Sequence, residues 1–172
     1  MSDAPANDHT EPSLAEAMAL AMRRLAKSVC IVTTRHEGQR IAMAATAIDS
    51  LSFDPPSLLV CINKTASIFP AFSARADFNI NILGQTQQHL ANRCNGPIKG
   101  EARFGEGEWI DDEVPWLSDA QAVVMCRHDG EFHYGTHGVF IGRVLDIRLH
   151  GEVDPLIYAD GLYGTTVLRR PQ

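Results

Sequence analysis

The segment from Met43 to Ser52 (MAATAIDSLS) is the first part of the chain whose residue types suggest chemistry. Its small side chains would let a flat ligand approach the backbone, whose N–H groups could then bind the carbonyls of a heterocycle, while nearby hydroxyls bind a phosphate. The residues expected to bind a ligand here are Met43, Ala44, Ala45, Thr46, Ala47, Ser50 and Ser52. A strand that needs small residues only to pack against a helix would show the same pattern.

A second candidate is the polar segment that follows an apolar run, 61–67 (CINKTAS). The run 58–62 predicts a buried strand, and residues 67–74 predict a short helix. A helix N-terminus, hydroxyls and an ammonium group together favour an anion site. The residues expected to contribute are Cys61, Asn63, Lys64 and Ser67. Helix capping by Thr65 or Ser67 is the alternative.

The third candidate lies in a long segment rich in Gly, Pro and charge, residues 95–118. We expect Lys99 and Arg103 to add positive charge to a phosphate site, and Phe104 to cover a ring. A solvated run of charges would look the same. Loops of this length in compact domains are usually functional or ordered by a partner.

Histidines form a fourth group, at His128, His133 and His137. His133 and His137 are four residues apart and would share one face of a continuous strand. Asp129-Gly130 and Gly135-Thr136 interrupt such a strand, and no carboxylate or cysteine clearly completes a ligand set, so we expect no metal site.

Several function classes are excluded by missing motifs. The chain has no G-x-S-x-G, no P-loop and no G-x-G-x-x-G between strand and helix, which argues against serine hydrolases and against phosphate binding of the P-loop or Rossmann type. Its four cysteines form no C-x-x-C pair, so we expect reduced thiols and a cytoplasmic protein.

Composition narrows the class further. The 172 residues carry a net charge of −6 with 45% hydrophobic residues, which is typical of one globular domain and argues against nucleic acid as a partner. No apolar run is long enough for a membrane helix, so we expect no membrane association.

The positioning elements are predicted from periodicity. We expect a disordered tail over residues 1–12 and one domain over 13–170. Ser13 and Glu16 form a capping-box pattern before a helix with Leu14, Met18 and Met22 on one face. Apolar or alternating segments predict strands at 29–34, 41–47, 58–62, 78–82, 120–127 and 138–149, with a bulge near Gly142, and a short helix at 85–94. This pattern favours a mainly β fold, an antiparallel barrel with short peripheral helices.

Taken together, these segments resemble the short flavin reductases of two-component flavin monooxygenases, such as the reductase component of 4-hydroxyphenylacetate 3-monooxygenase. The matching segments, in order between about residues 18 and 165, are 45–47 with Ser50 and Ser52, 55–63, 81–83 with Gln87, 101–104, 135–137 with Gly142 and Val144, and 156–158. Many relatives carry Asp where this chain has Thr136, and the 4-hydroxyphenylacetate type is similar to this chain at that position.

The resemblance implies an antiparallel split β-barrel that binds flavin and forms a homodimer. It implies FMN or FAD along 43–52, with its phosphate near Ser50, Ser52 and the 63–67 loop, and His137 beside the nicotinamide of NADH, or of NADPH. Tyr163, after the Asp160-Gly161 turn, is also expected at the cofactor. Hydride transfer needs stacking and alignment more than reactive side chains. Reduced flavin would then pass to a partner monooxygenase.

Three alternatives remain open on the sequence. One is a reductase that retains its flavin and acts on a corrinoid or a ferric chelate. Another is a non-catalytic flavin- or haem-binding module of the same fold. The third is a β-barrel dimer without a small ligand.

Overall fold

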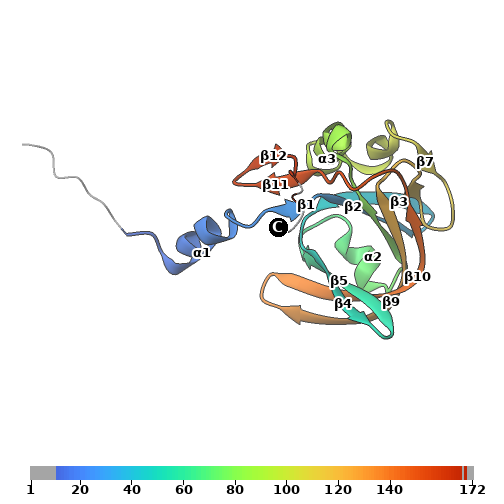
Figure 1. Cartoon of the computed structure of the whole chain (residues 1–172). Coiled ribbons are helices and arrows are strands. Elements are labelled where there is room, and N and C mark those ends of the chain that lie inside the picture. Colours follow the sequence, from blue (N-terminus) through green and yellow to red (C-terminus); the bar gives the residue numbers. More distant parts are fainter. Residues whose placement is uncertain (1–10, 168, 170–172) are drawn as a thin grey trace, which may run out of the picture.

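The computed structural model describes residues 11–167 and 169 (Figure 1). The tail expected over residues 1–12 therefore lies outside the described residues except for its last two positions, as do residues 168 and 170 at the far end of the expected domain. In the described part of the chain, no helix is long and apolar enough to cross a membrane.

A seven-stranded antiparallel sheet dominates the molecule, in the order β3-β2-β6-β9-β10-β5-β4. Its strands are β2 (Cys30–His36), β3 (Gln39–Ala45), β4 (Ile48–Phe53), β5 (Pro56–Asn63), β6 (Phe78–Ile82), β9 (Ala122–Tyr134) and β10 (His137–Leu149). A three-stranded sheet holds β1 (Lys27–Ser28), β11 (Ile157–Ala159) and β12 (Leu162–Gly164), and a small hairpin holds β7 (Trp109–Ile110) and β8 (Trp116–Leu117).

The sheet curls into a barrel because of one short connection. Strands β3 and β4 occupy opposite edges of the sheet, yet only Thr46 and Ala47 separate them in the chain. Such a link spans at most about 11 Å, so the two edges must approach each other. Within the described residues β3 and β4 do not pair, and the backbone carbonyl of Ala47 instead accepts a hydrogen bond from Cys61 N at 2.9 Å. The result is the predicted mainly β split barrel.

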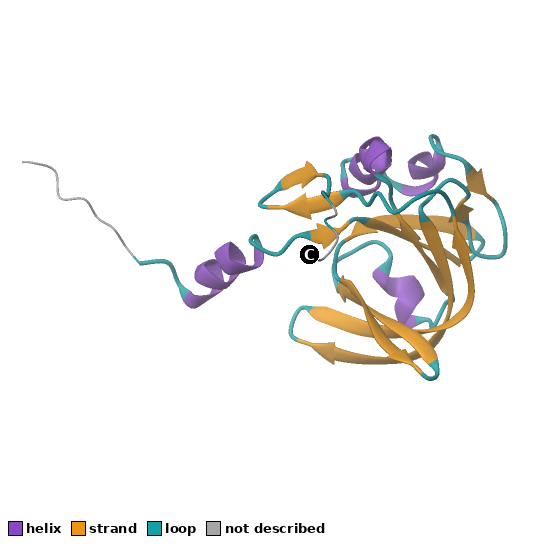
Figure 2. Ribbon diagram, in the orientation of Figure 1, coloured by secondary structure: helices purple, strands orange, loops and turns teal. Residues whose placement is uncertain are grey.

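Two apolar cores lie on the two faces of the sheet, as the alternation along β2 requires. Cys30 and Val32 face the inside of the curl, where they pack with Phe72 of α2 (Phe69–Ser73). Val29, just before β2, and Ile31 face outward, toward α3 (Gln88–Asn95). Figure 2 shows α2 within the curl and α3 outside it. The other helical segments are α1 (Leu14–Met22), η1 (Gln85–Gln87) and η2 (Gly100–Phe104).

The capping box predicted at the start of α1 is confirmed, since the Glu16 backbone N–H donates to Ser13 Oγ and the Ser13 N–H donates to the Glu16 carboxylate. The helix nevertheless buries none of its residues and projects from the barrel (Figure 1). Its apolar side chains include Leu14 and Met18, which are 88% and 64% exposed.

The strand predicted over 120–127 is longer than expected. Strand β9 continues through Asp129-Gly130 to Tyr134 and forms a long hairpin with β10. The Asp-Gly pair makes a bulge rather than a turn, because the pairing register shifts between Ile141 and Gly142, opposite Gly130 and His128. The bulge predicted near Gly142 is thus confirmed, and the interruption predicted at Asp129-Gly130 is wrong.

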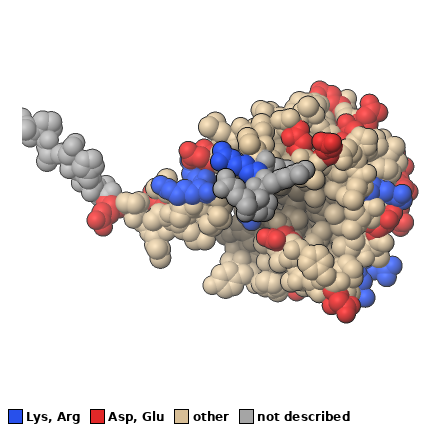
Figure 3. Space-filling view, in the orientation of Figure 1, with Lys and Arg blue, Asp and Glu red and all other residues tan. Residues whose placement is uncertain are grey.

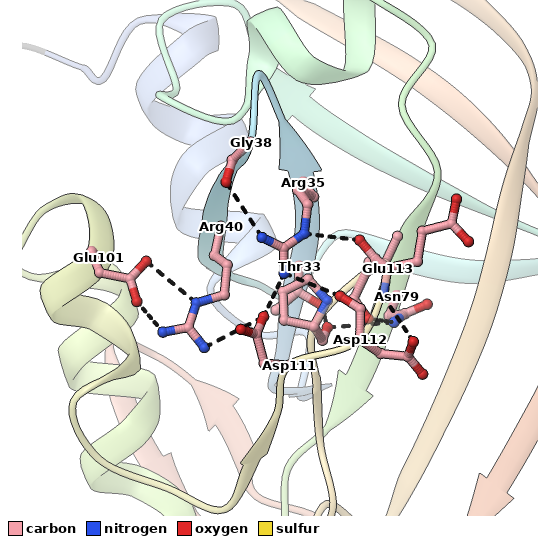
Figure 4. A network of polar contacts seen from close by, with 11 residues as sticks. Thr33, Arg35, Gly38, Arg40, Asn79, Glu101, Asp111, Asp112 and Glu113 are labelled. Carbon is pink, nitrogen blue, oxygen red and sulfur yellow. Dashed lines mark hydrogen bonds and ion pairs between the residues drawn. The ribbon is translucent and has the colours of Figure 1, made fainter.

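The long segment 95–118 makes polar contacts with β2 and β3 of the same chain (Figure 4). Arg35 on β2 forms an ion pair with Asp111 and donates to the backbone carbonyl of Asp112 at 3.1 Å. Arg40 on β3 forms an ion pair with Glu101. These contacts fasten the segment to the outer face of β2 and β3.

Candidate functional site

A cavity of about 290 Å³ opens at the split of the barrel, where the β3–β4 link passes the end of β5. We call it the alanine cavity. Eight residues expected to bind a ligand line it: Met43, Ala44, Ala45, Thr46, Ala47, Cys61, Asn63 and Tyr163. Val29, Ala66, Asn95 and Tyr158 complete its wall. Residues that are up to 134 positions apart in the sequence, Val29 and Tyr163, thus meet at one place.

The free edge of β3 supplies backbone hydrogen-bonding groups to this cavity. The carbonyl of Ala42 points away from β2, because it accepts a hydrogen bond from Arg103 NH1 at 2.5 Å. Alternate residues of a strand present their N–H and C=O groups on the same edge, so those of Ala44 lie on the open edge too. A methyl side chain at Ala44 leaves room for a planar ring to reach them. This edge therefore fits the donors and acceptors of a flat heterocycle.

Two tyrosines, from β11 and β12, also line the cavity. The rings of Tyr158 and Tyr163 meet edge to face with centroids 5.3 Å apart. Burial, and then the nearby Tyr158, raise the pKa of Tyr163 above its usual value. The Tyr163 hydroxyl consequently stays protonated at neutral pH and keeps its capacity to donate a hydrogen bond.

Two further cavities adjoin the alanine cavity, and Thr46 lines all three. A mainly apolar cavity of about 410 Å³ contains Ser50 and Ser52. A cavity of about 330 Å³, which we call the helix chamber, lies between the end of α1 and the β11–β12 turn. A separate open groove of about 630 Å³ near η1 and residues 150–154 shares no residue with these cavities and holds none of the expected site residues.

His137 stands beside the alanine cavity without lining it. It begins β10, lies opposite Asn63 of β5 in the strand register, and its Nδ1 is 2.9 Å from the Thr136 hydroxyl oxygen. The loop after Asn63 is tied to this hairpin, since Lys64 Nζ donates to the Gly135 carbonyl at 2.7 Å. The structure therefore brings His137 to the rim of the cavity, while the Lys64 ammonium group is committed to the hairpin.

The expectation that Arg103 and Phe104 would face a ligand is wrong. The guanidinium of Arg103 is buried and donates to the carbonyls of Ala42 and Ile98. Phe104 is buried against Trp109, with ring centroids 4.9 Å apart. Lys99 is exposed before η2 and lines none of the cavities at the split. Both side chains contact β3 instead, since Arg103 donates to the Ala42 carbonyl and the Arg40 guanidinium lies 4.5 Å from the centroid of the Phe104 ring.

Ser67 also lies outside the three cavities at the split, on the exposed surface. The helix expected from Ser67 begins later, as α2, and its N-cap Ile68 makes no side-chain capping bond. The hydroxyl and the backbone N–H of Thr65 bond instead to Asn63 Oδ1, at 3.0 and 2.9 Å. Ser67 therefore neither begins nor caps the helix, and the predicted anion site loses the helix N-terminus at that residue.

The histidine group divides in two. His128 Nε2 lies 3.2 Å from one oxygen of Glu131, and His133 Nε2 lies 3.5 Å from the other. His137 is on the opposite face of the hairpin from His133, since their register positions differ by one. No group of three metal-ligating side chains is arranged to hold an ion among the residues that the structure describes.

Sequence reasoning missed two residues at the site, Lys27 and Tyr158. Lys27 on β1 lines both the apolar cavity and the helix chamber, and Tyr158 on β11 pairs with it in the strand register. The contact between β1 and β11 joins segments 130 residues apart, so no local pattern could have revealed it.

The lining of the alanine cavity contains no nucleophile–base pair, and its only thiol, Cys61, has no histidine beside it among the lining residues. Small residues, an open strand edge and two aromatic rings fit a planar cofactor that carries its own reactivity. Residues 22–166 match the family described as "Flavin reductase like domain". The chain belongs to this family.

Characterised relatives agree with this assignment. The chain is 37% identical over 146 residues to the reductase component of FADH(2)-dependent resorcinol hydroxylase from Rhizobium sp. strain MTP-10005, covering 83% of this chain and 82% of that protein. It is 36% identical over 140 residues to the FMN reductase (NADH) RutF of Pseudomonas syringae pv. syringae, covering 80% and 79%. The solved structure of flavin reductase PheA2 superposes with a TM-score of 0.80 at 28% identity, covering 88% and 97%.

Proposed function

We propose that this protein is an NADH-dependent flavin reductase that reduces FMN or FAD and supplies the reduced flavin to a partner monooxygenase. The alanine cavity is the observation that carries the proposal, because its open β3 edge and small side chains fit an isoalloxazine ring. Flavin accepts hydride from nicotinamide at its own ring, so the protein contributes alignment.

The chain's own residues have separable tasks. The backbone of Ala44 binds the polar edge of the ring, and Tyr163 closes the cavity opposite the strand link. Ser50 and Ser52 lie in the adjoining cavity, within reach of a phosphate that leaves the ring past Thr46. His137, at the rim beside Asn63, positions the nicotinamide.

NADH is the preferred donor in this proposal. The guanidinium of Arg143, which could otherwise bind the 2′-phosphate of NADPH, donates to Asp129 at 3.2 and 3.1 Å. It also stands six residues from His137 along β10, which is about 20 Å in a strand. Four free cysteines fit a reducing compartment, so we place the protein in the cytoplasm.

Steady-state turnover with the four pairings of FMN or FAD with NADH or NADPH tests the function. We expect oxidation of NADH that depends on added flavin and is faster than oxidation of NADPH. Absence of nicotinamide oxidation with every pairing would overturn the proposal. Stimulation of a separately purified flavin-dependent monooxygenase by this protein and NADH tests the transfer of reduced flavin.

A further inference from the structure

The helix chamber adjoins the alanine cavity but is not needed for the flavin ring. The two cavities share Thr46 and Tyr158. The chamber's volume, about 330 Å³, exceeds the 290 Å³ of the alanine cavity itself. A ligand that fills both is therefore about twice as large as one that fills the alanine cavity alone.

The entrance of the chamber carries a basic side chain, Lys27, that could bind the second phosphate group, which FAD has and FMN lacks. Lys64 is bound to Gly135 and Arg103 is buried against β3. Lys27 lines both the chamber and the cavity of Ser50 and Ser52, and its one ion pair with the residues that the structure describes is long, with Nζ 3.9 Å from Asp49 Oδ2. Figure 3 shows basic side chains gathered where α1 meets the barrel. Lys27 is therefore placed to bind phosphate at the junction of the cavities.

The wall of the chamber suits a second flat ring. Ala19 and Met22 of α1 and Leu25 just after it supply apolar surface, and Tyr158 of β11 lines the same chamber. Arg23 fixes the position of this wall, because its Nε donates to Asp160 Oδ1 at 2.9 Å and its NH2 donates to the Asp160 carbonyl at 3.1 Å. An isolated helix of nine residues is marginal in water, and α1 buries none of its residues in the chain alone.

We propose that the helix chamber binds the adenylate half of FAD, with Lys27 on the pyrophosphate and the purine between α1 and Tyr158. This inference rests on the proposed flavin reductase function and adds that FAD is the preferred flavin. FMN ends at its single phosphate and leaves the chamber unfilled. Binding of FAD buries the inner face of α1 and orders the helix.

Titration calorimetry of oxidised FAD and FMN against the full-length protein tests the inference. We expect FAD to bind with a Kd at least about tenfold below that of FMN. Lys27→Ala should raise the Kd of FAD about tenfold, since it removes a charge-assisted bond, and change that of FMN less than about twofold. Ala19→Trp fills the chamber from an exposed helix position. It should also raise the Kd of FAD more than that of FMN.

Matched controls come from the same helix region. Arg24→Ala removes a neighbouring positive charge, and Ala21→Trp adds the same bulk on the other side of α1; neither residue lines the chamber, so both should leave the two Kd values unchanged. Hydrogen exchange gives a readout independent of the variants, with amides of α1 protected by FAD and not by FMN.

Equal Kd values for the two flavins in the wild-type protein would overturn the inference while leaving the reductase function standing. An equal loss of FAD and FMN affinity in Lys27→Ala would also overturn it, because Lys27 would then hold the phosphate common to both flavins. Failure of the wild-type protein to bind either flavin would overturn the proposed function itself.

Discussion

His137 is the side chain at the site whose position most directly predicts a kinetic effect. Its neighbours are Asn63 across the strand pair and the Thr136 hydroxyl, and it does not line the alanine cavity. We expect His137→Ala to slow flavin reduction by NADH about tenfold through lost alignment, with the flavin Kd changed less than about twofold. Anaerobic stopped-flow reduction and flavin titration measure the two quantities. The control is His89→Ala on α3, and an unchanged reduction rate in His137→Ala would remove this residue from the site.

Cys61 should be the most reactive of the four thiols, and its reactivity should depend on whether the alanine cavity is occupied. Burial raises the pKa of Cys30 to about 12, of Cys94 to about 11 and of Cys126 to about 12, so these remain unreactive thiols at neutral pH. Cys61 is partly exposed and lines the alanine cavity. We expect iodoacetamide to modify Cys61 first and bound flavin to slow that reaction, as peptide mass spectrometry would show. Equally rapid labelling of the three buried cysteines would contradict this expectation.

The same three thiols predict how stability changes in alkali. Their folded pKa values lie above the usual 9.0, so between pH 9 and about 12 the unfolded chain releases protons that the folded chain retains. By linkage, the contribution of these thiols to the free energy of unfolding is complete below pH 9. It is lost progressively as the pH rises toward 12. Urea unfolding across this range measures the slope, which should be shallower in Cys30→Ala. The same slope in Cys30→Ala and the wild-type protein would refute the assignment for Cys30.

At the scale of elements, Arg103 connects the 95–118 segment to the edge strand of the barrel. Its guanidinium bonds to carbonyls on both sides, Ala42 of β3 and Ile98. Arg103→Ala should lower the free energy of unfolding by about 3 kcal/mol, because buried carbonyls lose a charged donor. Arg103→Lys should restore little of the lost free energy of unfolding, since an ammonium group lacks the planar, forked donor geometry of a guanidinium group. Urea denaturation compares both with the exposed Lys99→Ala, and a loss below about 1 kcal/mol in Arg103→Ala would show that water replaces these bonds.

The elements that sequence patterns predicted correctly depend on local signals. Alternation of apolar residues at 78–82 gave strand β6, and Ser13 with Glu16 gave the start of α1. Asp129-Gly130 was misinterpreted as an interruption because an Asp-Gly pair is common in turns. Pairing with β10 along the whole hairpin keeps it within β9 as a bulge.

Sequence patterns predicted only those parts of the site that have a local signal. Its alanine-rich segment and the end of β5 are local patterns, and the structure brings both to one cavity. Arg103 looks like a member of a solvated charge run, and only the distant carbonyl of Ala42 explains its burial. Lys27 reaches the site through the β1–β11 pairing, which no local pattern encodes.

At the scale of the molecule, the exposed apolar residues favour the expected homodimer. Leu51 and Phe53 of β4 are 48% and 88% exposed, and Ile147 and Leu149 near the end of β10 are 51% and 80% exposed. Phe53 and Ile147 also line the apolar cavity, so the two strand ends form one patch. Patches of this kind usually mark protein interfaces. We expect the same patch on a second copy to cover it, in a two-fold symmetric interface.

Light scattering after size exclusion should therefore give twice the mass of the 18.9 kDa chain. The double variant Leu51→Asp with Leu149→Asp should shift the protein to monomer, because it buries two unpaired charges in the interface. Leu162→Asp, at a 70% exposed position on β12, is the control. A wild-type protein that runs as a monomer would contradict the dimer.

The two-residue link between β3 and β4 also determines when the binding site comes into existence during synthesis. The link lies near residue 46, but its two flanking strands connect only through β2, β6, β9, β10 and β5. The last of these strands to be synthesised is β10, which ends at Leu149, so the barrel can close only after that residue. A nascent chain that has passed the alanine-rich segment by a hundred residues still has no place for a flavin. The cofactor can therefore bind only a chain whose barrel is essentially finished, and it stabilises that state by mass action.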